Sequence, residues 1–302
     1  MVSNQKFHSL IVRENSPTDI YITQAKTILN KATGFMNGYD FTLNPYRGCQ
    51  YGCSYCYAAA FSPDKSRQQR WGDWVIVKEN AGAILAKELT RWYKKSSIPP
   101  RIYLSSVTDP YQPLEVKQKL TRKLLEVMLI YQPTLVIQTR SPTIIRDLDL
   151  LSQFQRLRIN LSIPTGSERV RKDFEGRSPS IKARLQTISK LKYNIPVNQN
   201  CDIRFSVTIT PLLPTFPKDE AFFIQQLAIV DRVVLQDFHP LRSNSLTAST
   251  RIEAIALKDK YAWWYGNNRH SYQNFKQKLQ NYFTALLADV EIMEGKAGFG
   301  FD

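Results

Sequence analysis

Apolar runs rich in β-branched residues alternate with longer amphipathic stretches along the middle of this chain. The runs predict buried strands, and helical periodicity follows most of them. Their nearly continuous apolar character is typical of a parallel sheet that is covered on both faces. The predicted strands are residues 39–43, 101–109, 134–141, 157–165, 205–214 and 232–240. The predicted helices between them are residues 113–131, 143–151, 181–191 and 220–230.

Six strands of this kind are fewer than the eight of a complete (β/α)8 barrel. The pattern therefore predicts an α/β fold built on a partial (β/α)6 TIM-type barrel. We expect an N-terminal extension over residues 1–38, the barrel over residues 39–240, and a helical C-terminal cap over residues 241–302. The cap carries two predicted helices, near residues 249–265 and 272–289.

The charge of the chain changes this picture by suggesting an anionic partner. The 302 residues include 41 Lys and Arg against 26 Asp and Glu, a formal net charge of +15. Such an excess attracts nucleic acid, acidic peptide segments or anionic membrane surfaces. Arginine outnumbers lysine over residues 140–192, which suits bidentate contacts to carboxylate or phosphate. The alternative is a solvated basic surface that serves only solubility.

The sequence also predicts the cellular compartment of the protein. No apolar run approaches the roughly 18–20 residues that a membrane span needs. The first residues, MVSNQKFHSL, have no basic region followed by a hydrophobic core, as a signal peptide would. We therefore expect a cytoplasmic protein with no membrane contact, in which thiols stay reduced and structural disulfides are rare.

Three of the four cysteines lie in CQYGCSYC, residues 49–56, directly after the first predicted strand. Functional residues of parallel α/β folds gather at the carboxyl ends of strands, so this loop is expected at a site. A zinc site needs four ligands, and the three histidines are distant in sequence. A redox C-x2-C pair leaves Cys49 unused. An iron–sulfur cluster takes thiolates, and three of them leave one iron open.

The spacing C-x3-C-x2-C, with Tyr55 before the third cysteine, resembles the signature of radical S-adenosylmethionine (SAM) enzymes. The stretches that carry a closer resemblance, to the spore photoproduct lyase-like family, are NPYRGC, VTDPYQPLE (107–115), LTR (120–122) and TRSPTIIRDLDLL (139–151). With LSIPT and TPLLP they cover about residues 39–215. The resemblance implies a partial barrel, a [4Fe–4S] cluster with SAM on its open iron, and an external electron donor. It also implies a 5′-deoxyadenosyl radical that takes hydrogen from the substrate.

The same resemblance implies roles for individual residues. The cluster ligands are Cys49, Cys53 and Cys56, and the expected SAM contacts are Tyr55 at the adenine, Thr108 and Asp109 at the amino group, Arg140 at the carboxylate and Ser162 near the ribose. Each position also has an ordinary structural explanation. Asp109-Pro110 and Ser141-Pro142, for example, are common in turns and helix caps.

One departure from spore photoproduct lyase concerns the last hydrogen transfer. That enzyme has a cysteine in the second-strand region that returns hydrogen to the product radical, and Ser106 stands at that place here. The remaining thiol, Cys201, precedes the fifth predicted strand, where a cysteine is usually a small buried hydrophobe. Tyr111 is a further candidate relay, although such tyrosines more often pack. These three residues are weak catalytic candidates.

Two substrate classes follow from the resemblance. Spliceases, which resemble the same family, cut a tyramine unit out of a ribosomal precursor peptide, and an accessory protein would fit the aromatic C-terminal part. Spore photoproduct lyase repairs a nucleic-acid lesion. Because the hydrogen-returning thiol is missing, we expect a lyase-type enzyme acting on a precursor peptide, with lesion repair as the alternative. A third reading is a non-catalytic iron–sulfur or zinc protein that binds nucleic acid.

Overall fold

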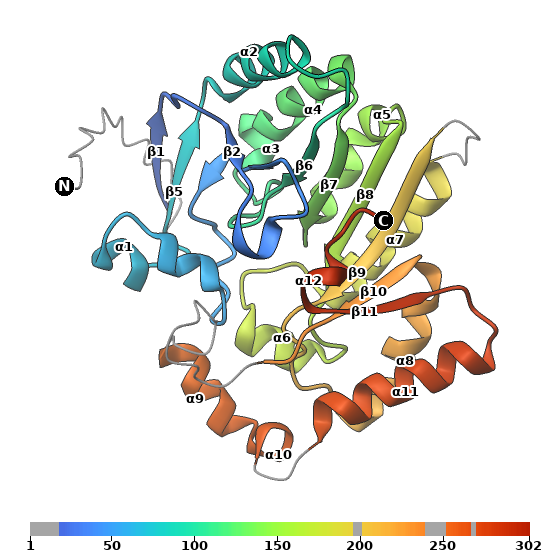
Figure 1. Cartoon of the computed structure of the whole chain (residues 1–302). Helices are drawn as coiled ribbons and strands as arrows, with labels where there is room; N and C mark the ends of the chain where they lie inside the picture. The colour runs from blue at the N-terminus through green and yellow to red at the C-terminus, as the bar shows by residue number, and fades with distance from the viewer. Residues whose placement is uncertain (1–17, 196–200, 239–251, 267–269) are drawn as a thin grey trace.

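The computed structural model describes residues 18–195, 201–238, 252–266 and 270–302. An eight-stranded sheet organises them in the order β11-β10-β9-β8-β7-β6-β3-β2 (Figure 1). Its strands are β2 (Leu29–Lys31), β3 (Phe41–Leu43), β6 (Arg101–Leu104), β7 (Thr134–Thr139), β8 (Arg156–Ser162), β9 (Asp202–Ile209), β10 (Arg232–Leu235) and β11 (Glu291–Glu294). Every neighbouring pair from β3 to β11 is parallel, and β2 is antiparallel to β3.

The six predicted strands correspond to β3, β6, β7, β8, β9 and β10, which confirms the α/β partial barrel. The second one is shorter than predicted. β6 ends at Leu104, and residues 105–109 form a loop at the carboxyl edge of the sheet instead of continuing the strand. This loop is polar in sequence, yet Ser105 and Asp109 are both buried in it.

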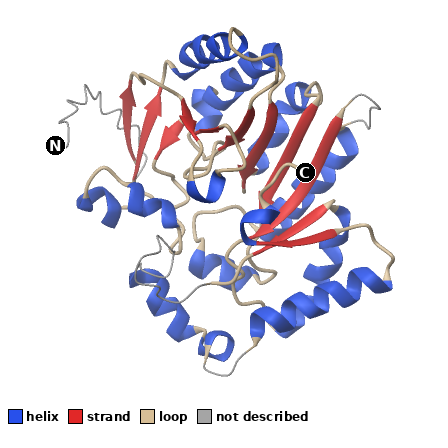
Figure 2. Ribbon diagram, viewed as in Figure 1, coloured by secondary structure: helices blue, strands red, loops and turns tan. Residues whose placement is uncertain are grey.

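Helices cover the sheet along its length (Figure 2). The longer ones are α2 (Ala81–Tyr93), α4 (Leu120–Tyr131), α7 (Ile181–Asn194), α8 (Pro217–Gln226) and α11 (Ser271–Ala285). The shorter ones are η1 (Gly34–Met36), η2 (Tyr57–Phe61), α1 (Lys65–Gln69), α3 (Glu115–Gln118), η3 (Pro142–Asp147), α5 (Leu148–Leu151), α6 (Glu168–Phe174), η4 (Leu227–Ile229), α9 (Ile252–Lys260), α10 (Ala262–Tyr265) and α12 (Gly295–Gly298). The predicted helix over 113–131 divides at Lys119, whose φ of 49° ends α3 before α4 begins. No helix in these described ranges is both long and apolar enough to cross a membrane.

The two faces of the sheet differ in polarity. Alternate residues of β8, such as Leu157 and Ile159, join the main apolar core. The residues between them, Arg158 and Asn160, are also buried, but on the opposite face. The strands are therefore not apolar throughout, as the sequence pattern suggested. Their second face lines the inside of the barrel, where the buried guanidinium of Arg158 finds hydrogen-bond partners.

The last residues of the chain supply some of those partners. Arg158 donates from Nε to the carbonyl of Phe301 over 2.8 Å, and Arg232 donates from Nη1 to the carbonyl of Gly300 over 2.9 Å. Phe299 and Phe301 pack against Tyr103 inside the barrel. The C-terminal segment thus fills part of the barrel interior.

The structure contains further strands beside the six that were predicted. β1 (Asp19–Thr23) and β4 (Tyr46–Arg47) flank β5 (Trp74–Lys78) in a separate three-stranded sheet. At the other edge β11 pairs in parallel with β10, a strand that the predicted helical cap did not include. The division into three parts stays a prediction. Residues 1–17, the end of the predicted strand over 232–240 and the start of the predicted helix over 249–265 lie outside the described residues.

Candidate active site

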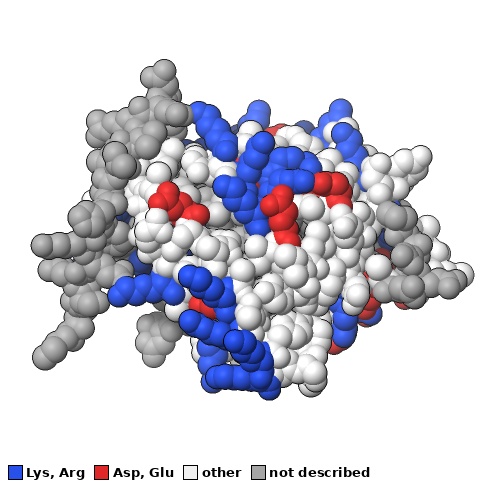
Figure 3. Space-filling model, turned by 90° about the horizontal axis from the view of Figure 1, so that it is seen from above, with Lys and Arg blue, Asp and Glu red and all other residues white. Residues whose placement is uncertain are grey.

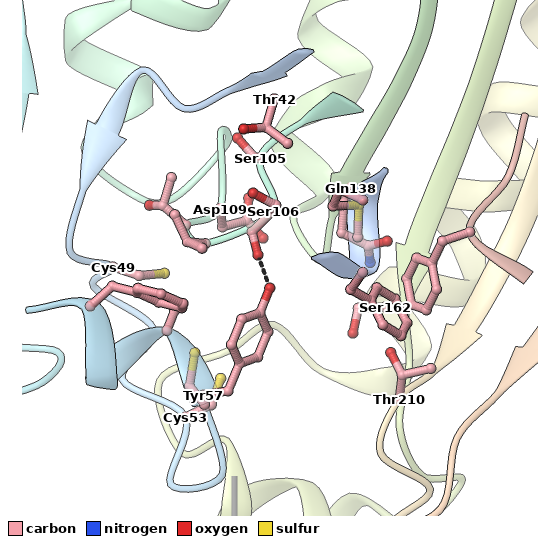
Figure 4. A pocket seen from close by; sticks show the side chains of 18 of the residues that line it. Thr42, Cys49, Cys53, Tyr57, Ser105, Ser106, Asp109, Gln138, Ser162 and Thr210 are labelled. Carbon is pink, nitrogen blue, oxygen red and sulfur yellow. Dashed lines mark hydrogen bonds between the residues drawn. The ribbon is translucent and has the colours of Figure 1, made fainter. Parts of the chain in front are cut away.

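A cavity of about 870 Å³ opens where the parallel strands end (Figure 4). Cys49, Cys53 and Tyr57 lie on one side of it, and Gln138 and Ser162 lie opposite. Most of the predicted site residues line this cavity: Cys49, Cys53, Tyr55, Cys56, Ser106, Thr108, Asp109, Arg140 and Ser162. The fold therefore brings together residues that are more than a hundred positions apart in sequence.

The cysteine loop depends on two glycines with positive φ. Gly48 has a φ of +82°, and a Cβ added there would lie 2.4 Å from the carbonyl oxygen of Trp74. Gly52 has a φ of +55°, and a Cβ there would approach Gly72 Cα to 3.0 Å. A side chain at either position would be strained and would push the loop away from its neighbours. These contacts explain the glycines that precede Cys49 and Cys53.

The loop after β6 holds the cysteine loop in place. The Thr108 hydroxyl donates to the carbonyl of Gly48 over 2.7 Å. Gln112 accepts from the backbone N–H of Gln50 over 2.9 Å, and Gln50 accepts from that of Leu114 over 2.6 Å. The stretch VTDPYQPLE therefore holds the cysteine loop in position, a role that the sequence did not predict. Thr108 also lines the cavity, so its predicted SAM contact stays a prediction.

Asp109 joins the ends of β6 and β7. Its Oδ1 accepts from the backbone N–H of Tyr111 at 2.9 Å and from the hydroxyl of Thr139 at 2.7 Å. Its Oδ2 accepts from the backbone N–H of Arg140 at 2.8 Å. Burial raises the pKa of Asp109, although the neighbouring Arg140 opposes the rise. The carboxylate thus already has a structural task, and its contact with SAM remains a prediction.

Arg140 lies at the centre of the polar contacts around Cys53. Its Nη1 is 2.9 Å from Cys53 Sγ and 3.1 Å from the Tyr55 hydroxyl. The same nitrogen and the Tyr55 hydroxyl both contact Oε1 of Glu175. The other oxygen of Glu175 lies 2.6 Å from Arg184 Nη2. One carboxylate between two arginines therefore fixes the guanidinium that faces the cysteine loop.

The charges of this cluster are set by burial and by each other. Glu175 and Arg184 are both 0% exposed. Burial alone would raise the pKa of Glu175, but Arg184 and Arg140 together hold it below its ordinary value. Burial raises the pKa of the Cys53 thiol to about 12, against the lowering effect of Arg140. The raised pKa means that iron must displace a proton when it binds the Cys53 thiol.

Glu175 and Arg184 were missed by the sequence reasoning. They lie in EGRSPSIKAR, more than a hundred residues after the cysteine loop, within a stretch noted only for its basic charge. Glu175 is the one acidic residue of this stretch, and that was the available signal. Because buried arginines without a counter-charge are costly, such a glutamate is a candidate partner for them.

The three weak catalytic candidates are placed differently. Ser106 lines the cavity, and its carbonyl accepts from the Tyr57 hydroxyl (Figure 4). Tyr111 is fully buried in the main apolar core and is not part of the cavity wall. Cys201 precedes β9, so the eight-residue strand, roughly 26 Å long, separates it from the carboxyl edge. Of these three residues, Ser106 alone lines the cavity.

The donor set fits an iron–sulfur cluster. The three cysteines lie on one short loop, and all of them line the same cavity. Within the described ranges, no three or more His, Cys, Asp or Glu side chains are grouped to hold a single metal ion. The thiols are thus not arranged as a one-ion zinc site, whereas a cluster binds each thiolate at a separate iron.

A parallel partial barrel with three thiols in the loop after its first strand defines the class of SAM-dependent iron–sulfur enzymes. Residues 43–226 match the model of the Radical SAM superfamily, and the chain belongs to that superfamily. Its cofactors are accordingly a [4Fe–4S] cluster and SAM.

Relatives with similar sequences include the protein MJ0683 of Methanocaldococcus jannaschii, 34% identical over 200 residues that span 66% of this chain and 70% of the relative. The protein Rv2578c of Mycobacterium tuberculosis is 27% identical over 187 residues, 58% of this chain but 50% of its own length. This chain therefore matches only half of the mycobacterial relative.

Solved structures with a similar fold include spore photoproduct lyase complexed with dinucleoside spore photoproduct. It has a TM-score of 0.58 and 13% identity, over 90% of this chain and 81% of that one. Streptococcus suis SuiB bound to the precursor peptide SuiA has a TM-score of 0.53 and 10% identity, over 84% of this chain and 48% of that one. At sequence identities this low, the similarity shows a shared fold and nothing about the substrate.

Proposed function

We propose that this radical SAM enzyme is a lyase that acts on an altered base in nucleic acid. The observation that carries the proposal is the aromatic wall of the cavity. Tyr57 and Phe61 come from the cysteine side, and Phe35 and Phe299 come from the N-terminal and C-terminal segments. Flat aromatic faces accept unstacked bases, and proteins that work on a base take it out of the helix into such a pocket.

The charge of the molecule supports the same substrate. A net charge of +15 favours contact with the phosphate backbone. Lys and Arg side chains gather in groups on the face shown in Figure 3, where acidic side chains are fewer. The spore photoproduct lyase that shares this fold was solved with a dinucleoside lesion, which adds support.

When bound, the cluster and SAM supply a 5′-deoxyadenosyl radical that removes a hydrogen atom from the substrate. In the proposed site, Cys49, Cys53 and Cys56 hold the cluster. Arg140, placed by Glu175, lies where it can meet the SAM carboxylate with a charge-assisted hydrogen bond. Tyr55 and Ser162, which line the same cavity, would border the rest of the cofactor. The aromatic wall orients the base and excludes water from the reacting atoms.

The sequence alone favoured a precursor peptide, and the comparisons support the nucleic-acid alternative better. SuiB, solved with a precursor peptide, shares the fold over only 48% of its chain, whereas spore photoproduct lyase shares it over 81%. The missing thiol at Ser106 remains a difference from spore photoproduct lyase. It implies that another group returns the hydrogen atom, or that the product leaves in another form.

The test compares the two substrate classes directly. The reconstituted enzyme is incubated anaerobically with SAM, dithionite and one of three additions: an ultraviolet-irradiated thymine-rich oligonucleotide, the same oligonucleotide without irradiation, or a tyrosine-containing acidic peptide. We expect 5′-deoxyadenosine to rise above its substrate-free rate only with the irradiated strand, and Cys53→Ala to abolish the rise. A rise with the peptide alone would overturn the proposal.

A further inference from the structure

A second hollow, of about 340 Å³, adjoins the cavity and shares Ala58, Phe61 and Ser106 with its wall. Two cationic side chains, Arg47 and Lys78, line it. No carboxylate is among the described residues that line it. A basic hollow beside a substrate cavity calls for an explanation, because neither the cluster nor SAM has been assigned to it.

The position of both cations follows from strand pairing. β4 and β5 are antiparallel, and Arg47 lies opposite Ile76. Lys78 follows Ile76 by two positions, so its side chain lies on the same face of this small sheet as that of Arg47. Diagonal neighbours of this kind are about 7–8 Å apart at their backbones, within reach of long side chains. The other face, with Tyr46 and Val77, packs into the main core.

Among the described residues, both cationic side chains donate hydrogen bonds to backbone carbonyls. Arg47 donates from Nη2 to the carbonyl of Phe61 over 2.8 Å, and Lys78 donates from Nζ to the carbonyl of Asn44 over 2.7 Å. The nearby cations differ from them, because Arg67 pairs with Asp64. No ion pair within 4.0 Å joins Arg47 or Lys78 to a carboxylate in the described ranges.

Burial adds to the cost of this arrangement. Burial, and to a lesser degree Arg47, lowers the pKa of Lys78 to about 8. A partly buried ammonium beside a second cation, with no carboxylate of the described residues within 4.0 Å, is unfavourable. An anion in the hollow would offset this penalty at Lys78 and could also contact the exposed Arg47, which lines the same hollow.

We propose that the Arg47–Lys78 hollow is a phosphate subsite that binds a backbone phosphate of the strand whose base enters the cavity. This inference rests on the proposed function, because it assumes a nucleic-acid substrate. Asn30, Thr42 and Asn44 also line the hollow and offer polar groups beside the two cations. The shared wall places the phosphate next to the base pocket, as a single nucleotide requires.

The test uses the salt dependence of binding. Affinity for a single-stranded thymine oligonucleotide is measured across a range of salt concentrations with the reconstituted enzyme and SAM. Each lost phosphate contact reduces the slope of log affinity against log salt by about 0.7 for a single strand. We expect Lys78→Gln and Arg47→Gln to reduce the slope by this amount and to weaken binding roughly fivefold near 0.1 M salt. Lys123→Gln, at an exposed position of α4, is the control and should change neither.

The outcomes separate the two proposals. If the wild-type enzyme binds an acidic peptide but no oligonucleotide, the proposed function fails. If it binds the oligonucleotide and both variants keep the wild-type slope, the phosphate subsite is wrong and the proposed function stands.

A second measurement covers variants that fail to fold. Lys78 of the wild-type enzyme is labelled with a pulse of acetic anhydride and quantified by mass spectrometry. We expect the oligonucleotide to protect Lys78 and to leave Lys123 equally labelled. Equal labelling of Lys78 with and without bound oligonucleotide would overturn the subsite.

Discussion

At the scale of single residues, the site depends on a buried charge that lies outside every motif around the cysteines. Glu175 contacts Arg140 and Tyr55 with one oxygen and Arg184 with the other. Without its charge, the buried Arg184 would lose its carboxylate partner, Arg140 would keep Asp109 at 4.0 Å, and the guanidinium beside Cys53 would lose its anchor. Breaking a buried pair in this way typically costs about 3–5 kcal/mol.

The Glu175→Gln variant tests this role. We expect it to lower the free energy of unfolding of the cluster-free protein at pH 7 by about 3–5 kcal/mol, measured with urea. Glu126→Gln, which removes an exposed partner of Arg122, is the matched control and should cost less than about 1 kcal/mol. Equal losses in the two variants would contradict the assignment.

The same variant carries a pH signature. Because the arginines hold the pKa of Glu175 below its ordinary value, against burial, its charge contributes stability at pH values above about 4.3. That contribution is lost as the pH falls through the lower, folded-state pKa, since the unfolded chain then binds the proton more readily. Between pH 6 and 3 the wild type should therefore lose more stability than Glu175→Gln. Parallel curves would argue against a charged Glu175.

At the scale of elements, the loop between β3 and η2 presents the three thiols because its backbone follows a path that only glycine permits at two points. Gly48 packs against Trp74 of β5, and Gly52 packs against Gly72. The loop after β6 then binds it through Thr108 and Gln112. The placement of the thiols is thus a property of three neighbouring segments.

A Gly48→Ala variant should disturb this placement. The added Cβ would lie 2.4 Å from the Trp74 carbonyl oxygen, at a φ that side chains rarely adopt. We expect the anaerobically reconstituted variant to hold less than half of the wild-type iron and sulfide. Gly38→Ala, where the added Cβ meets nothing within 4 Å, should retain the full amount. Full iron content in Gly48→Ala would show that the loop does not need this contact.

Much of this arrangement was predictable from the sequence, because strand–helix alternation and the cysteine spacing are local signals. The polar inner face of the barrel was not predictable. Arg158 and Asn160 lie within the apolar run LRINLS, and only the folded sheet shows which face they occupy. β11 is four residues long, too short for a periodic signal. Glu175 and Cys53 are joined only through Arg140 in the folded chain, and no local pattern in the sequence links them.

At the scale of the whole molecule, the cavity is shaped by the segments that lie outside the barrel, at the two ends of the described chain. Phe35 from the N-terminal part and Phe299 from the C-terminal part pack edge to face, with ring centroids 5.4 Å apart. Both line the cavity, together with aromatic residues that follow the cysteine loop. The barrel therefore supplies the cofactor side of the site, and the two ends of the described chain supply a wall of the substrate side.

The central claim is that Cys49, Cys53 and Cys56 hold a cluster with one iron open to SAM. Electron paramagnetic resonance of the dithionite-reduced, reconstituted protein tests it most directly. We predict a [4Fe–4S]⁺ signal whose g-values shift when SAM is added, and the loss of that signal in Cys53→Ala but not in Cys201→Ala. A cluster signal that SAM leaves unchanged, or one that survives Cys53→Ala, would contradict the account.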